Sequence, residues 1–234
     1  MKIGNFPSSF LRVSGVSVVS PMSGPNIAIV DYQAGNLRSV QKALESLGAC
    51  PRITSDASDI EGADAVVFPG QGASHSSMRE LRARDLVSPI KDVVASGKPF
   101  LGVCLGLQLL LEESEEGAEP CLGVLAGRVR RLPSGVKVPH MGWNQVEFHR
   151  EHRVLDGIPN GSYFYFVHSY YADPQDQSIV AGTTAYGVEM CSVVAWDNVA
   201  AVQFHPEKSG AVGLQLYRNF VHLVEAWKAG DTWR

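Results

Sequence analysis

The amino-acid sequence predicts an α/β protein with an open, mostly parallel sheet flanked by helices and an antiparallel, β-rich C-terminal half. In the first half, short apolar runs alternate with amphipathic helical segments, which is typical of βαβ units whose sheet is covered on both faces. After about residue 120, strand-like segments joined by short turns replace this alternation. Because no obvious linker separates the two patterns, we expect one domain with a parallel and an antiparallel part.

Length and composition favour one large domain. The chain has 234 residues, 45% of them hydrophobic, which is ample for a single core. Its net charge of −4 does not favour binding to nucleic acid or to an anionic membrane. The four cysteines are widely spaced without a CxxC pair, so we expect no disulfide framework and a cytoplasmic protein. No metal-ligand spacing, phosphate loop or membrane-spanning apolar run is present, so we expect no metal, no cofactor and no membrane association.

Residues 1–25 differ from the rest of the chain. They contain Lys2 and Arg12 but no acidic residue, and they are rich in serine. A transit peptide, a signal peptide or an untranslated stretch before a true start at Met22 would each fit. We expect residues 1–25 to be a poorly ordered extension and residues 26–234 to form the one functional domain.

The first elements follow from local patterns. The apolar run 26–31 predicts a strand, and a turn at 33–36 leads to a helix at 37–47 whose apolar residues recur at helical spacing before Gly48. A short strand is expected at 50–54 and an apolar strand at 65–68, which ends in the glycine-rich loop Pro69-Gly70-Gln71-Gly72. Helices are predicted at 78–86 and 88–96.

The second half is expected to be largely strands. They are predicted at 122–132, 145–148, 163–167, 179–183, 193–196 and 200–204, followed by a final helix at about 212–227.

The most informative stretch joins a strand at 100–103 to helix-forming residues at 105–112, with Cys104 at the turn. Gly102 and Gly106 flank the cysteine in the spacing of a nucleophile elbow, where strand and helix backbones come close. A helix N-terminus favours the thiolate form of a cysteine. The alternative is a buried structural cysteine, which most single cysteines are.

A catalytic cysteine needs a base and a group that orients the base. His205 ends an apolar strand, and Pro206 holds it in an extended conformation, so that Glu207 can reach its ring. His168 also follows an apolar strand but has no acid two residues later, so we expect it to have a supporting role. Carboxyl ends of parallel strands share one crevice, which should bring the 31–36 turn, the 69–74 loop and Cys104 together.

These motifs resemble the class I glutamine amidotransferases, which release ammonia from glutamine with a Cys-His-Glu triad. Within that family, residues 26–228 resemble the glutaminase subunits of imidazole glycerol phosphate synthase. The resemblance rests on the elbow 102–108, the segment His205-Pro206-Glu207-Lys208-Ser209, the turn 31–40, the loop 69–73, the acidic run 112–117 and Pro139-His140-Met141-Gly142-Trp143-Asn144. Gln71 and Ser74 depart from the family's usual glycine loop.

The resemblance implies a role for each matching residue. Cys104 would be the nucleophile, His205 the base and Glu207 its orienting acid. The oxyanion donors would be two backbone N–H groups. One is the N–H of Leu105, which elbow geometry also indicates, and the other is the N–H of Gln71 or Gly72. The substrate glutamine would be held by Gln108, Glu116, Ser169 and Tyr170.

The resemblance also implies a partner, a separate cyclase subunit with a (β/α)₈ barrel that receives the ammonia in a heterodimer and makes imidazole glycerol phosphate and an aminoimidazole carboxamide ribonucleotide. We expect the docking face to include Asn36, Met141, Trp143 and Lys208. The alternatives are another class I amidotransferase or a stand-alone glutamyl hydrolase, and a non-catalytic module that kept the fold.

Overall fold

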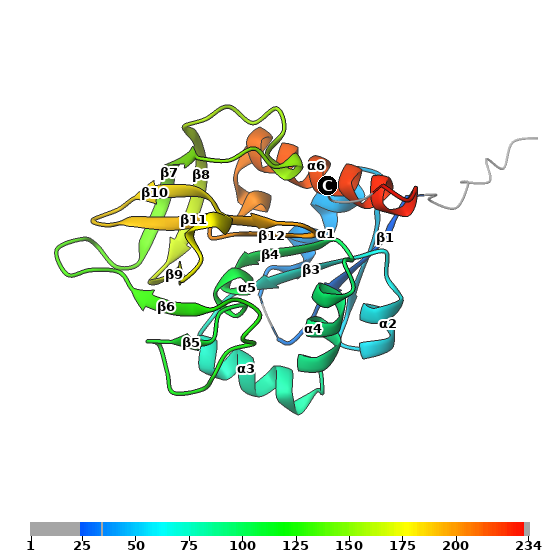
Figure 1. The fold of residues 1–234 in the computed structure, drawn as a ribbon, viewed down its shortest axis with the longest axis horizontal. Coiled ribbons are helices and arrows are strands. Elements are labelled where there is room, and N and C mark those ends of the chain that lie inside the picture. Colours follow the sequence, from blue (N-terminus) through cyan, green and yellow to red (C-terminus); the bar gives the residue numbers. More distant parts are fainter. Residues whose placement is uncertain (1–23, 34, 232–234) are drawn as a thin grey trace, which may run out of the picture.

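A mixed sheet organises the computed structural model, which describes residues 24–33 and 35–231 (Figure 1). Nine strands follow one another in the order β2-β1-β3-β4-β12-β11-β10-β7-β8, and β5, β6 and β9 pair beside this path. The predicted extension 1–25 lies outside the described residues except for residues 24 and 25. Pro25 is buried and its carbonyl accepts a hydrogen bond from the Cys50 N–H at 2.9 Å.

The first half of the sheet is parallel, as the sequence predicts. Strand β1 lies between β2 and β3, and β4 lies between β3 and β12. These strands are β1 (Asn26–Val30), β2 (Cys50–Thr54), β3 (Ala65–Gly70), β4 (Phe100–Cys104) and β12 (Val199–Val202). Every residue of β3, β4 and β12 is buried, because helices cover both faces of the sheet.

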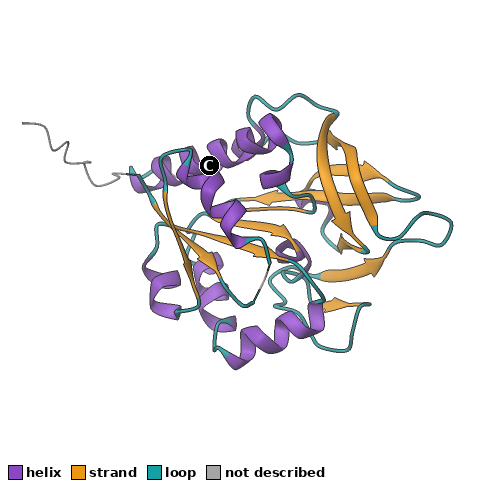
Figure 2. Cartoon of the chain, turned by 180° about the vertical axis from the view of Figure 1, so that it is seen from behind, coloured by secondary structure: helices purple, strands orange, loops and turns teal. Residues whose placement is uncertain are grey.

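The helices divide between the two faces (Figures 1 and 2). Buried residues of α1 (Leu37–Glu45) and α6 (Gly210–Lys228) pack in one core cluster. Those of α2 (Ala57–Gly62), α3 (Ser74–Ala83), α4 (Val87–Ala95) and α5 (Leu105–Gln108) pack in the other. Alternate strand residues point to opposite clusters: Ile27 and Ile29 belong to the first, and Ala28 and Val30 to the second.

The second half is antiparallel, also as predicted. From β12 outward, β11, β10, β7 and β8 pair in antiparallel fashion. Their bounds are β7 (His140–Phe148), β8 (Ser162–His168), β10 (Val180–Ala185) and β11 (Glu189–Trp196). A smaller layer contains β5 (Glu113–Ser114), β6 (Gly127–Arg131) and β9 (Tyr170–Pro174), and three short 3₁₀ turns are η1 (Arg153–Leu155), η2 (Gln177–Ile179) and η3 (Pro206–Lys208).

Several predicted boundaries were wrong. The helix predicted at 78–86 begins at Ser74, where the Glu116 carboxylate accepts the Ser74 N–H at 2.6 Å, and the sequence near Ser74 gives no sign of this distant cap. The helix predicted after Cys104 ends at Gln108. Carbonyls of 109–111 instead accept backbone N–H groups of 122–125, so the strand predicted from residue 122 begins at Gly127. The short elements α2, β5 and β9 were not predicted, and β7 begins five residues before the predicted strand at 145–148.

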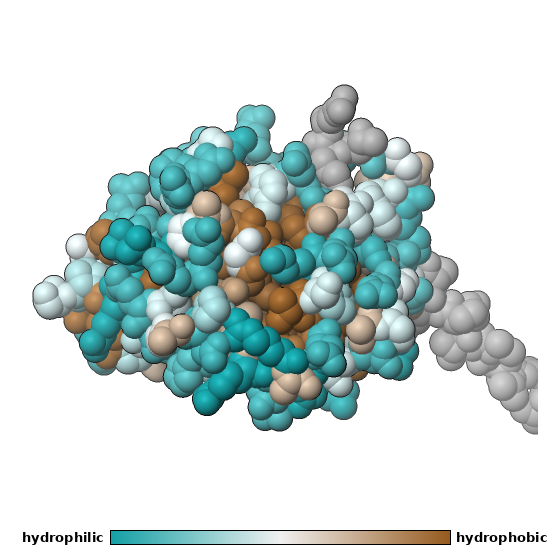
Figure 3. All heavy atoms as spheres, turned by 60° about the horizontal axis from the view of Figure 1, so that its bottom comes forward, coloured by the Kyte–Doolittle hydropathy of each residue, from teal (hydrophilic) through white to brown (hydrophobic). Residues whose placement is uncertain are grey.

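The face of the molecule in Figure 3 is mostly hydrophilic. The face in Figure 3 gathers hydrophobic residues in a hollow near its centre, with hydrophilic residues around them. Among the described residues, the large hydrophobic side chains left exposed are Met141, Trp143 and Tyr163. No helix in the described ranges is long and apolar enough to cross a membrane.

Candidate active site

Cys104 lies at a strained turn between the central strand β4 and the short helix α5. Its backbone has φ 54° and ψ −108°, a combination that residues with a side chain rarely adopt. Such strain persists only where the surroundings hold it, and it is found at catalytic nucleophiles. The side chain is 5% exposed at the carboxyl end of the parallel sheet, where the sequence places the crevice.

Two glycines make this turn possible. A Cβ atom on Gly106 would lie 1.8 Å from the Phe68 carbonyl oxygen, which is an impossible contact with backbone. A Cβ atom on Gly102 would lie 2.8 Å from the Ala201 Cβ and 3.2 Å from the Gly106 carbonyl carbon. The elbow therefore needs both glycines for close approach of the backbone, as the spacing predicts.

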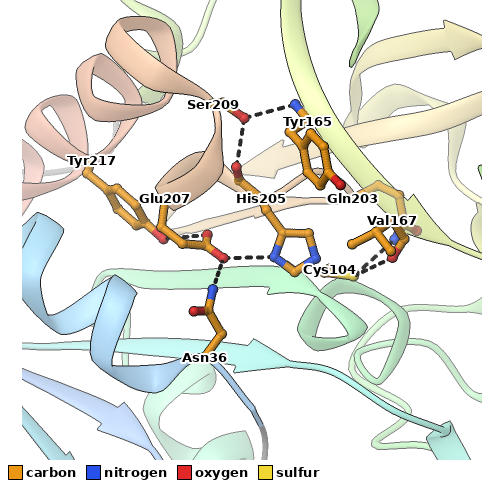
Figure 4. A network of polar contacts seen from close by, with 9 residues as sticks. All are labelled: Asn36, Cys104, Tyr165, Val167, Gln203, His205, Glu207, Ser209 and Tyr217. Carbon is orange, nitrogen blue, oxygen red and sulfur yellow. Dashed lines mark hydrogen bonds and ion pairs between the residues drawn. The ribbon is translucent and has the colours of Figure 1, made fainter. Parts of the chain in front are cut away.

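His205 and Glu207 form a buried pair beside the cysteine (Figure 4). The His205 Nδ1–H donates to Glu207 Oε1 at 2.9 Å, and the two side chains are 3% and 2% exposed. Since a carboxylate only accepts, the proton is on Nδ1 and Nε2 is left for Cys104. Nε2 is buried, has no hydrogen bond among the described residues and faces the sulfur in Figure 4.

Further hydrogen bonds hold the base and its acid in place. The Asn36 side-chain amide donates to Glu207 Oε1 at 2.6 Å, and the Tyr217 hydroxyl donates to Oε2 at 3.4 Å. The His205 backbone is tied to β8: its N–H donates to the Tyr165 carbonyl at 2.9 Å. Glu207 is thus held by the residue before α1, by α6 and by His205 itself.

Electrostatics match a nucleophile–base pair. Burial alone would lower the pKa of His205, but the adjacent Cys104 sulfur and then the hydrogen bond and charge of Glu207 raise it. Burial works to raise the pKa of Glu207, but the hydrogen bond and charge of His205 hold it below its ordinary value. The arrangement therefore favours an ionised Glu207 carboxylate beside a protonated His205 imidazole. It can perform nucleophilic attack on a carbonyl followed by proton transfer to a leaving group.

A cavity of about 380 Å³ opens over the cysteine. It is large enough for an amino-acid-sized molecule. Every residue named for the oxyanion donors and for substrate lines this cavity together with Cys104: Gln71, Gly72, Leu105, Gln108, Glu116, Ser169 and Tyr170. The structure thus brings these residues together, while their individual roles remain predictions.

Two of the predicted substrate ligands already have partners within the protein. The Gln108 amide donates to the Tyr170 carbonyl at 2.7 Å and to Gln203 Oε1 at 3.0 Å. Glu116 Oε2 accepts the Ser74 N–H at the start of α3. These contacts fix both side chains at the cavity wall before any substrate binds. Within the described ranges, no group of three or more His, Cys, Asp or Glu could hold a metal ion.

His168 lines the cavity but is bonded away from the cysteine. Its Nδ1–H donates to the Tyr170 carbonyl at 2.8 Å, and its Nε2 accepts from His140 Nδ1 at 3.0 Å. Burial, the largest effect, lowers the pKa of His168 to about 3 and that of His140 to about 4, so both rings are neutral. This bonding fits the predicted supporting role and does not fit a base for Cys104.

The residues predicted for a docking face occupy different settings. Met141 and Trp143, two apart on β7, are 61% and 55% exposed. Lys208 lies 5.8 Å from the centre of the Tyr165 ring, which also packs edge-on against Trp143. Asn36 is half-buried, and its amide donates a hydrogen bond to Glu207, a contact that the sequence did not predict. Whether these side chains contact a partner stays a prediction.

Known proteins are similar to this chain both in sequence and in fold. A family model described as "Glutamine amidotransferase class-I" matches residues 28–224. The "Imidazole glycerol phosphate synthase subunit HisH" of Gloeothece citriformis is 52% identical over 202 residues, covering 85% of this chain and 96% of that protein. The chain belongs to the HisH branch of the class I glutamine amidotransferases. The HisH of Dehalococcoides mccartyi is 51% identical, covering 85% of this chain and 97% of its own length.

A solved structure titled "Crystal structure of glutamine amidotransferase" has the same fold as this amidotransferase. It superposes with a TM-score of 0.67 at 23% identity and covers 85% of this chain and 98% of the other. The mixed sheet, the elbow on its central parallel strand and the antiparallel half therefore represent the amidotransferase architecture. The fold class predicted from the sequence is confirmed.

Proposed function

We propose that this chain hydrolyses glutamine to glutamate and ammonia with the triad Cys104, His205 and Glu207. The observation that carries the proposal is the convergence of an elbow cysteine and a buried His–Glu pair at one amino-acid-sized cavity. The named function of the HisH relatives, a subunit of imidazole glycerol phosphate synthase, supports it.

The reaction begins when the Cys104 thiolate attacks the side-chain amide carbon of glutamine. The carbonyl oxygen becomes an oxyanion, for which the Leu105 N–H and an N–H from Gln71 or Gly72 are the proposed donors. The His205 imidazolium gives its Nε2 proton to the amine, the C–N bond breaks, and ammonia leaves a thioester on Cys104.

Hydrolysis of the thioester completes the cycle. His205, now neutral, takes a proton from water, and the resulting hydroxide attacks the thioester carbon. The C–S bond breaks, the product leaves as the side-chain carboxylic acid, which loses its proton to solvent to become glutamate, and the thiolate–imidazolium pair is restored. Glu207 keeps the proton of Nδ1 in place and stabilises the imidazolium throughout.

The ammonia, in this proposal, is consumed by a cyclase subunit in histidine biosynthesis, with imidazole glycerol phosphate and an aminoimidazole carboxamide ribonucleotide as products. The proposed partner is a (β/α)₈ barrel that docks in a heterodimer. Exposed Met141 and Trp143 supply apolar anchors of the kind that dominate interfaces, with Lys208 beside them and Asn36 close to the triad.

Glutamine hydrolysis by wild type and Cys104→Ala, with and without the cyclase subunit and its nucleotide ligand, tests the proposal. We expect Cys104→Ala to lose ~10⁴-fold or more in kcat, because nothing replaces the nucleophile. Cys121→Ala, which removes a different buried thiol, is the matched control and should remain active. Equal hydrolysis by Cys104→Ala and wild type would overturn the triad. Full activity without any response to the cyclase would favour a stand-alone hydrolase.

The docking face has its own test. Trp143→Ala should weaken binding to the cyclase subunit by ~30-fold, because truncation of an anchoring tryptophan removes about 2 kcal/mol of binding free energy. Lys91→Ala, an exposed change on α4, is the control. A titration with unchanged affinity for Trp143→Ala would remove this residue from the proposed face.

A further inference from the structure

A buried glutamine that the proposed mechanism does not use lies beside the nucleophile. Gln203 directly follows β12, whose last parallel pair with β4 joins Val202 to Val103, so Gln203 lies next to Cys104, the last residue of β4. The Gln203 residue is 0% exposed, and its Nε2 lies 3.7 Å from Cys104 Sγ (Figure 4). A side-chain amide is costly to bury unless its polar atoms are bonded, so this placement calls for a reason.

The hydrogen-bond network fixes which end of the Gln203 amide faces the sulfur. The Tyr170 carbonyl can only accept, so the Gln108 atom 2.7 Å from it must be the nitrogen. The same nitrogen donates to Gln203 at 3.0 Å, which makes that Gln203 atom the oxygen. The remaining amide atom of Gln203, directed at Cys104, is therefore an N–H donor.

A donor at this position distinguishes the two protonation states of the cysteine. A thiolate is a far better acceptor than a thiol, so an amide N–H directed at the sulfur stabilises the charged form. The Val167 carbonyl, 4.0 Å from Sγ, can accept only from the protonated thiol. Loss of the Gln203 donor would leave the thiolate with His205 on one side and no amide on the other.

We propose that Gln203 is a positioning residue that stabilises the Cys104 thiolate and links it, through Gln108, to the wall of the glutamine cavity. The inference rests on the proposed glutaminase activity. The link has a consequence for substrate binding: a ligand that moves Gln108 or the Tyr170 carbonyl also moves the donor on the nucleophile.

Other titratable groups near the sulfur are accounted for. His205 presents the opposite charge from the segment after β12, and Glu207 lies behind it. Tyr32, after β1, is neutral, because burial and the Cys104 charge raise its pKa, and His168, at the end of β8, is neutral because burial lowers its pKa. Replacing Gln203 with an uncharged residue therefore changes hydrogen bonding without changing the charge around Cys104.

The test is the pH dependence of Cys104 alkylation by iodoacetamide in the absence of glutamine, followed by mass spectrometry of the Cys104 peptide. Gln203→Met keeps the length of the side chain but has no donor. We expect it to raise the midpoint of the alkylation profile by about one pH unit and to slow alkylation about tenfold below that midpoint. We also expect kcat for glutamine to fall by a larger factor than KM rises, because the donor contacts the nucleophile directly and the substrate site only through Gln108.

Asn198→Leu is the matched control. It removes the hydrogen bonds that the Asn198 amide donates to the Val94 and Lys98 carbonyls at 3.0 and 2.7 Å, at the end of β12 opposite Gln203, and should leave the alkylation profile unchanged. If Gln203→Met does not fold, alkylation of Gln108→Leu provides the test. This variant removes the hydrogen bond that orients the Gln203 oxygen, so the midpoint of its alkylation profile should also rise, by a smaller amount. A profile identical to wild type in the folded variant would overturn the inference. Absence of Cys104-dependent glutamine hydrolysis in wild type would instead overturn the proposed function.

Discussion

The buried histidine pair behind the cavity predicts that mild acid destabilises the fold. His140 and His168 are 4% and 6% exposed, and their rings are joined by a 3.0 Å hydrogen bond. The His140 ring also stacks on Tyr186 at 3.9 Å between centroids. His140 donates to His168, and His168 donates to the Tyr170 carbonyl. A proton added to either ring would turn an accepting nitrogen into a donor and disrupt this chain, so the folded state resists protonation.

The sign and size follow from the pKa of His140. Burial lowers it from the ordinary value of 6.5 to about 4, so the unfolded chain binds more protons between these values. The contribution to the free energy of unfolding is therefore fully present above pH 6.5 and is lost as the pH falls toward about 4. For His140 alone, the loss between about pH 7 and about pH 4.5 is about 2 kcal/mol. His168, with its pKa lowered to about 3, acts in the same direction.

Urea unfolding followed by tryptophan fluorescence over this pH range measures the effect. His140→Phe keeps a flat ring between Tyr186 and Phe166 but cannot be protonated, so it should lose about 2 kcal/mol less stability in acid than wild type does. His222→Gln, at an exposed position of α6, should retain the wild-type dependence. If His140→Phe lost as much stability in acid as wild type does, the buried pair would not be the cause.

Two other predictions concern the nucleophile. Despite burial, which lowers it, the pKa of His205 is raised to about 10 by Cys104 and Glu207, so the stability from this ion pair is complete below about pH 6.5 and is lost as the pH rises through about 10. Thermal unfolding of wild type should show this alkaline loss, and Cys104→Ala should reduce it. Gly106→Ala should lower stability by about 3 kcal/mol and abolish hydrolysis, because its Cβ would lie 1.8 Å from the Phe68 carbonyl oxygen. Gly62→Ala, whose Cβ would have nothing within 4 Å, is its control, and equal melting temperatures for the two variants would contradict the steric argument.

The sequence predicts those parts of the site whose signals are local. The elbow glycines act within two residues of Cys104, and Glu207 lies two residues from its histidine, so spacing alone indicates both contacts. Strand β2, which follows the helix stop at Gly48, has the predicted bounds Cys50–Thr54. In each of these places the neighbours along the chain are also the neighbours in space.

Contacts between distant segments were not predictable in this way. Gln203 and Cys104 are separated by 99 positions, and no pattern near either residue indicates that they meet. Asn36 reaches Glu207 across 171 positions. The leucines after Gln108 are good helix formers, but their carbonyls bond to residues 122–125, and this tertiary pairing overrides their local preference.

The place of β12 in the sheet has a consequence for synthesis of the chain. β4, with the nucleophile at its end, pairs on one side with β3 and on the other with β12, which is made far later. At about 5–20 residues per second, a ribosome needs roughly 5–20 s to pass from the cysteine to its base. During that interval the β4 edge is open, and an unpaired apolar edge is a site for misassociation. The nascent chain therefore lacks the proposed base until β12 is inserted, and the insertion of this one late strand both closes the open edge of β4 and completes the proposed triad.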